Sequence, residues 1–124
     1  MRLRRRLAAL AVVATAAVPG LIVGTAAPAS ADDSYCRPPD AHERTCIQFR
    51  GDKNGFRALA YAVNYYGHVD IWGPGITFEH SATGTDPKIA KNGLGSGWVC
   101  AHGWAQLANG QFIDMGFPCV PVPE

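Results

Sequence analysis

The amino-acid sequence predicts an all-β fold: a small antiparallel β-sandwich or barrel stapled by two disulfides. Three observations support this class. Short runs rich in aromatic and β-branched residues alternate with clusters of glycine, proline and asparagine. The dipeptide Asn109-Gly110 separates two apolar runs, which is a strong local signal for a β-hairpin. Finally, four cysteines follow a segment typical of exported proteins, in which thiols oxidise to disulfides.

Residues 1–31 have the layout of a secretory signal peptide. A basic stretch precedes the apolar residues 7–18, and the segment ends in Ala29-Ser30-Ala31. An uncleaved membrane anchor is the alternative. Against it, the apolar run that such an anchor would use, residues 7–29, is rich in alanine, is interrupted by Pro19-Gly20 and is followed by acids. We therefore expect cleavage near Ala31 and a secreted, extracellular protein that does not associate with the membrane after cleavage.

The net charge of the chain combines two unlike parts. The whole sequence has 11 Lys and Arg against 10 Asp and Glu, a net charge of +1. Four of the arginines and none of the acids lie in residues 1–31, so residues 32–124 carry 7 bases and 10 acids, or −3. A nucleic-acid partner is not expected for an acidic domain.

The hairpin signal also predicts the disulfides. If Asn109-Gly110 is a two-residue loop, paired residue numbers sum to 219, which places Cys100 opposite Cys119. Cys36 and Cys46 then form the second bridge. It pins an N-terminal segment, residues 32–44, to a β-sandwich domain at residues 45–121. A zinc site is the alternative, but no C-x-x-C or C-x-x-H pair is present.

The same hairpin predicts which side chains are buried. The bulkier face carries Cys100, His102 and Trp104, with their partners on the following strand, and we expect this face to pack in the core. His102 is then a buried, hydrogen-bonded histidine. The other face, which includes Ala101 and Gly103, is expected to lie outside.

Further strands follow from runs bounded by turns. We expect strands at residues 45–50, 56–66, 69–72, 76–80, 98–107 and 112–120, and a loop at 81–95. One segment is ambiguous, because apolar residues within 56–66 also recur at helical spacing. Its aromatic and β-branched residues favour a strand.

Catalytic groups are few. His68 and Asp70 lie two residues apart, so a strand would place both on one face, and a small hydrolase could use the histidine as base and the carboxylate to orient it. The simpler interpretation is a solvated pair at a turn. The other histidines add no recognisable motif, and no serine lies in a nucleophile frame. We therefore expect no metal and no cofactor, and a protein that is not an enzyme.

Aromatic residues are abundant for so short a chain. The segment 65–74 combines aromatics with a polar pair and two turns. Tyrosine and tryptophan are favoured at binding surfaces because they offer a large apolar body with a polar handle. If the protein binds a ligand, the candidate residues are Tyr65, Tyr66, His68, Asp70 and Trp72. The alternative is that these aromatics only close the core.

Three sequence stretches resemble small secreted two-disulfide β proteins of high-GC Gram-positive bacteria. They are Tyr-Gly-His-Val-Asp-Ile-Trp-Gly-Pro at 66–74, Trp-Val-Cys-Ala-His-Gly-Trp at 98–104 and Phe-Pro-Cys-Val at 117–120. The resemblance implies location and fold, and it implies no activity. The chain is also similar in size and disulfide number to the proteinaceous α-amylase inhibitors. Their Trp-Arg-Tyr triplet is absent here, so their activity does not transfer.

These observations predict a secreted, non-enzymatic binding module, which we expect to be a monomer. Its partner would be a protein, such as a secreted hydrolase that it inhibits, or an extracellular polysaccharide. A small hydrolase that uses His68 and Asp70 is the second hypothesis, and a passive extracellular structural protein is the third. An exposed aromatic row would favour binding, whereas a concave pocket around His68 and Asp70 would favour catalysis.

Overall fold

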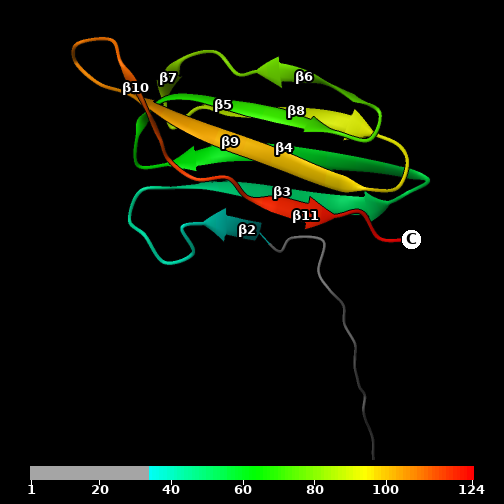
Figure 1. Cartoon of the computed structure of the whole chain (residues 1–124). Helices are drawn as coiled ribbons and strands as arrows, with labels where there is room; N and C mark the ends of the chain where they lie inside the picture. The colour runs from blue at the N-terminus through cyan, green and yellow to red at the C-terminus, as the bar shows by residue number, and fades with distance from the viewer. Residues whose placement is uncertain (1–33) are drawn as a thin grey trace, which may run out of the picture.

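A computed structural model describes residues 34–124 (Figure 1). The predicted signal peptide lies outside these residues. The described part is all-β and consists of two antiparallel sheets that pack face to face as an open sandwich, without closing into a barrel. No helix in this part is long and apolar enough to cross a membrane.

The first sheet has the strand order β2-β3-β4-β8. Its strands are β2 (Ser34–Arg37), β3 (Arg44–Asp52), β4 (Gly55–Val63) and β8 (Lys88–Gly93). The β3–β4 hairpin turns at Lys53-Asn54, as the cluster of turn formers there predicts. Segment 56–63 is therefore a strand and not a helix. It ends earlier than predicted, because Asn64 takes a positive φ of 67° that breaks the strand.

The second sheet has the order β10-β9-β5-β6, with β11 also paired to β9 and β7 to β5. Its strands are β5 (Tyr66–Gly73), β6 (Ile76–His80), β7 (Gly84–Thr85), β9 (Trp98–Gln106), β10 (Phe112–Asp114) and β11 (Cys119–Pro121). The prediction of a loop over 81–95 was wrong. This segment contains β7 and the edge strand β8. The sequence of β8 shows no hydrophobic alternation, and the strand forms through long-range pairing with β4.

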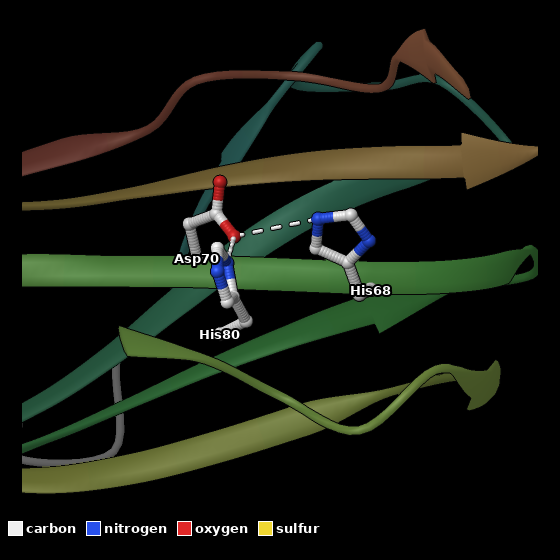
Figure 2. Close-up of side chains that lie close together, drawn as sticks. All are labelled: His68, Asp70 and His80. Carbon is white, nitrogen blue, oxygen red and sulfur yellow. Dashed lines mark hydrogen bonds and ion pairs between the residues drawn. The ribbon is translucent and has the colours of Figure 1, made fainter. Parts of the chain in front are cut away.

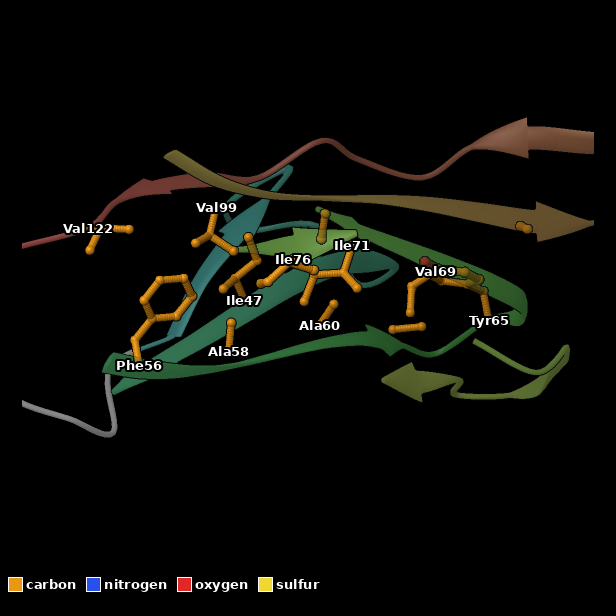
Figure 3. Close-up of a cluster of buried hydrophobic side chains, with 13 residues drawn as sticks. Ile47, Phe56, Ala58, Ala60, Tyr65, Val69, Ile71, Ile76, Val99 and Val122 are labelled. Carbon is orange, nitrogen blue, oxygen red and sulfur yellow. The ribbon is translucent and has the colours of Figure 1, made fainter. Parts of the chain in front are cut away.

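The core lies between the two sheets (Figure 3). Larger aliphatic side chains from both sheets meet at its centre, and Phe56 and Val122 close one end. Much of the remaining core consists of alanines, among them Ala58 and Ala60 on β4 and Ala101 and Ala105 on β9. These short side chains allow the two sheets to approach closely.

The predicted core face of β9 was wrong. Ala101, Gly103 and Ala105 point into the core, whereas His102 and Trp104 lie on the outer face. The reason is close packing between the sheets, because a Cβ at Gly103 would lie 1.8 Å from Thr45 Oγ1 and 2.0 Å from the Tyr65 hydroxyl. A bulky side chain has no room there, and the large side chains of β9 therefore face outward.

Both predicted disulfides are present. Cys36–Cys46 joins β2 to β3, and Cys100–Cys119 joins β9 to β11, each between directly opposed residues. The hairpin loop, however, differs from the prediction. Leu107 pairs with Gln111, which makes a three-residue loop whose last residue, Gly110, has a φ of +89°.

A β-bulge restores the predicted register at the cysteines. The backbone of Gly103 bonds to both Met115 and Gly116, so two residues oppose one. The longer loop lowers the sum of paired residue numbers by one, and the bulge raises it by one before Cys119. The predicted pairing of Cys100 with Cys119 is therefore confirmed, although the loop length was wrong.

Candidate functional site

The outer face of the second sheet carries most of the residues proposed from the sequence. Strand β5 alternates, so Gly67, Val69 and Ile71 point inward. Its other residues, Tyr66, His68, Asp70 and Trp72, therefore share the outer face. Tyr66 is exposed, and His68 and Trp72 are partly buried.

Asp70 is the centre of this face. Its side chain is only 10% exposed, yet it has three neighbouring donor groups. His80 Nδ1 lies 2.8 Å from Oδ1, His68 Nε2 lies 3.4 Å from the same oxygen, and Trp104 Nε1 donates to Oδ2 at 3.0 Å. In Figure 2, dashed lines join one oxygen of the Asp70 carboxylate to both imidazole rings. The buried carboxylate is thus held by hydrogen bonds on both oxygens.

An irregularity in the β5–β6 hairpin brings His80 to this position. Gly73 pairs with Ile76 at the turn, but beyond it Ile71 pairs with Glu79 and Asp70 with His80. Without the register shift between Ile71 and Gly73, Asp70 would face Glu79, and two carboxylates would oppose each other. Because of the bulge, the Asp70 carboxylate lies opposite the His80 imidazole.

A second histidine–aspartate pair lies on the same face. His102 Nε2 lies 3.0 Å from Asp114 Oδ2, and the backbone N–H of Gly116 donates to Asp114 Oδ1 at 2.8 Å. The Gly116 hydrogen bond, with help from His102, lowers the pKa of Asp114 below its usual value. Asp114 is exposed, so this pair orients His102 more than it stabilises the fold.

Aromatic rings surround the two pairs. Trp72 packs against Phe78 and Phe117, with ring centroids 5.7 and 5.4 Å apart, and His102 packs on Trp104 at 4.1 Å. Phe78 and Phe117 are about half exposed. We call this surface the histidine face. Its members are His68, Asp70, Trp72, Phe78, His80, His102, Trp104, Phe112, Asp114 and Phe117.

A surface pocket of about 240 Å³ lies at one side of the histidine face. It is lined by His68, His80, Ser81, Thr83 and Phe112. The Ser81 hydroxyl already donates to the Ala82 carbonyl and accepts from the Val69 N–H. The nearest serine is therefore occupied by backbone hydrogen bonds and is not directed at either imidazole.

Tyr65 is the proposed binding residue that lies elsewhere. It is 7% exposed and belongs to the core (Figure 3). Its hydroxyl lies 2.7 Å from Thr45 Oγ1. Burial raises the pKa of its phenol to about 12. Four of the five proposed residues thus share one face, and the fifth stabilises the interior.

Sequence reasoning missed several residues of the face. The sequence assigns His102, Trp104 and Phe117 to the core face, which is wrong, and it gives His80 and Phe78 no role. The strand prediction at 76–80 contained part of the signal for His80. Its pairing partner depends on a bulge that has no clear sequence signature.

The chain matches no family model, no curated protein and no solved structure.

Proposed function

We propose that this protein is exported and acts as a non-enzymatic binding module, with the histidine face as its recognition surface. The two disulfides are compatible with an extracellular location. The proposed export rests on the signal-peptide layout of residues 1–31 and agrees with the resemblance to small secreted proteins. The partner we favour is a protein.

The observation that carries the proposal is the group of exposed rings on an ordered sheet face. Phe78, Phe112 and Phe117 are between 42% and 51% exposed, although the chain has a separate core between its sheets. Aromatic residues that are exposed but held by neighbouring rings are typical of protein-binding surfaces, because little side-chain entropy remains to be lost on binding.

The histidine face supports binding better than hydrolysis. Asp70 lies between two imidazoles and also accepts from Trp104, so it does not orient a single catalytic base. The hydroxyl of Ser81, beside the pocket, is engaged with the backbone. A protein partner is favoured over a polysaccharide because the three phenylalanines exposed on the histidine face lack a polar group for sugar hydroxyls.

The first test is export. The full chain expressed in a bacterial host should accumulate in the culture medium, and mass spectrometry should find an N-terminus near Asp32. A chain that stays with the membrane and retains its first 31 residues would contradict the proposal.

The second test is binding by the protein recovered from the medium. Surface plasmon resonance against a panel of purified secreted hydrolases, and sedimentation with insoluble polysaccharides, compare wild type with Phe78→Ala and Trp72→Ala. We expect saturable binding to one hydrolase, weakened about tenfold or more by either substitution. Leu94→Ala is the matched control, because Leu94 is 61% exposed and lies outside the histidine face.

Three outcomes would overturn the binding proposal. They are no saturable binding to any protein of the panel, binding that Leu94→Ala weakens as much as Phe78→Ala, and binding to polysaccharide alone. Because Phe78 is half exposed, its variant should fold normally, which far-UV circular dichroism checks.

A further inference from the structure

We propose that His68, Asp70 and His80 form a binding site for a divalent transition-metal ion of the zinc type. The sequence alone led us to expect no metal. The inference goes beyond the proposed function and does not depend on it, because a metal could bind here whether or not the histidine face has a protein partner.

The three side chains offer the right atoms in nearly the right places. Their ligand atoms, two imidazole nitrogens and one carboxylate oxygen, all lie within 4.8 Å of one another. A tetrahedral zinc ion with bonds of about 2.0–2.1 Å keeps its ligand atoms roughly 3.3 Å apart. His68 Nε2 already lies 3.4 Å from Asp70 Oδ1, and His80 Nδ1 lies 2.8 Å from it (Figure 2).

The adjustment that metal binding requires falls on the residue best able to make it. The His80 side chain is 64% exposed and stands at the last position of β6, so its ring has room to shift. The Asp70 and His68 side chains are only 10% and 18% exposed. Two ligands are therefore held in place by the sheet and the third can adapt.

Trp104 provides the kind of hydrogen bond that usually orients a metal ligand. Its Nε1 donates to Asp70 Oδ2, which leaves Oδ1 directed at both imidazoles. Hydrogen bonds of this kind orient ligating carboxylates, and their loss typically weakens metal affinity by about 10- to 100-fold. A nine-tenths buried carboxylate aimed into a pair of imidazoles is the second observation that points to a cation.

The donor set also selects the class of metal. Two imidazoles and one carboxylate suit zinc and similar ions, whereas magnesium and calcium prefer oxygen ligands alone. The pocket beside His68 and His80 leaves room for a water molecule as fourth ligand. Thiolate competition is absent, since the cysteines of residues 34–124 are all in disulfides.

The rival interpretation is an ion pair between Asp70 and protonated histidine, with no role for metal. Isothermal titration of the purified, untagged protein with zinc chloride separates the two. We expect one zinc ion per chain with micromolar or tighter affinity, and no binding of magnesium or calcium under the same conditions. The ion-pair interpretation predicts only weak zinc binding without fixed stoichiometry.

Variants assign the site. His80→Ala and Asp70→Asn should each weaken zinc binding at least tenfold, and Trp104→Phe should weaken it by about 10- to 100-fold while leaving the three ligands in place. His42→Ala is the matched control, an exposed histidine outside the cluster, and should bind zinc as wild type does.

Equal zinc affinity in wild type and His80→Ala would overturn the proposal, as would loss of binding in His42→Ala. Because His80 is exposed, its variant remains informative even if Asp70→Asn fails to fold. A metal-binding protein that recognises no hydrolase would refute the proposed function alone. A hydrolase-binding protein without zinc affinity would refute only the metal site.

Discussion

Tyr65 and Tyr66 are neighbours in sequence but lie in opposite environments. Tyr66 is 52% exposed at the start of β5, whereas Tyr65 fills the core beneath Gly103. Thr45 Oγ1 donates to the Met115 carbonyl, which leaves the Tyr65 hydroxyl to donate to Thr45. This buried chain of hydrogen bonds joins β3 of one sheet to the bulge in the other.

The raised pKa of Tyr65 gives a prediction at high pH. Its phenol ionises near 10 in the unfolded chain and near 12 in the folded protein, so between these values the folded state holds the proton more tightly. The protonated Tyr65 phenol therefore makes its full contribution to the free energy of unfolding below pH 10. That contribution is lost as the pH rises towards 12, by up to about 2 kcal/mol. Urea unfolding between pH 8 and 12 measures it.

Tyr65→Phe tests the cause of that loss. The variant should be less stable than wild type at pH 8, by about 1 kcal/mol for the lost hydrogen bond, but should lose less stability above pH 10. Tyr66→Phe, at the exposed neighbour, serves as the control and should follow wild type. Parallel curves for wild type and Tyr65→Phe would contradict the assignment to Tyr65.

At the scale of the element, alternation along a strand predicted that His68 and Asp70 share a face. Such inferences are reliable because the strand period of two is a property of the backbone. Which face is buried is decided by what packs above it. On β9 the small residues face inward because Thr45 and Tyr65 occupy the space over Gly103, and no pattern within β9 contains that information.

The β9–β11 hairpin shows how local errors can compensate. The extra loop residue and the bulge at Met115-Gly116 cancel, so the cysteines pair as the simplest loop predicts. Gly116 makes the bulge possible, because it has a φ of +118° and its Cβ position lies 2.0 Å from the Arg37 carbonyl oxygen. Only glycine combines that conformation with so close an approach.

Gly116→Ala should therefore destabilise the protein by roughly 3 kcal/mol, from backbone strain and the clash with Arg37 together. Gly110→Ala is the matched control. It also stands at positive φ, but its Cβ would meet nothing within 4 Å, so we expect a loss of only about 1 kcal/mol. Thermal unfolding compares the two, and equal losses would mean that strain alone explains the effect.

At the scale of the whole molecule, each disulfide lies within one sheet and neither crosses the core. Cys36–Cys46 holds β2, and Cys100–Cys119 holds β11, to the strand beside it. The two sheets are held together by the narrow core, with an ion pair between Lys91 of β8 and Glu79 of β6 at the surface. The bridges thus restrain peripheral strands whose own apolar contacts are few.

Removal of one disulfide tests whether the bridges restrain only the peripheral strands. The loops closed by the bridges span 10 and 19 residues, and loop entropy predicts a loss of about 3 kcal/mol for either. The double substitution Cys36→Ala with Cys46→Ala should lower the free energy of unfolding by that amount and loosen β2, which hydrogen exchange detects. Unchanged protection of residues 34–37 would show that β2 does not need the bridge.

The sequence by itself determined the all-β class, most of the strands, the disulfide pairing and the shared face of His68 and Asp70. The fold class, the strands and the shared face follow from backbone period and turn chemistry, which act locally. The predicted pairing of Cys100 with Cys119 holds because the longer loop and the bulge cancel. Only the tertiary structure decided that β8 is a strand, that His102 and Trp104 face outward, and that His80 meets Asp70. Those outcomes depend on close packing between sheets and on bulges, where distant residues compete for the same space.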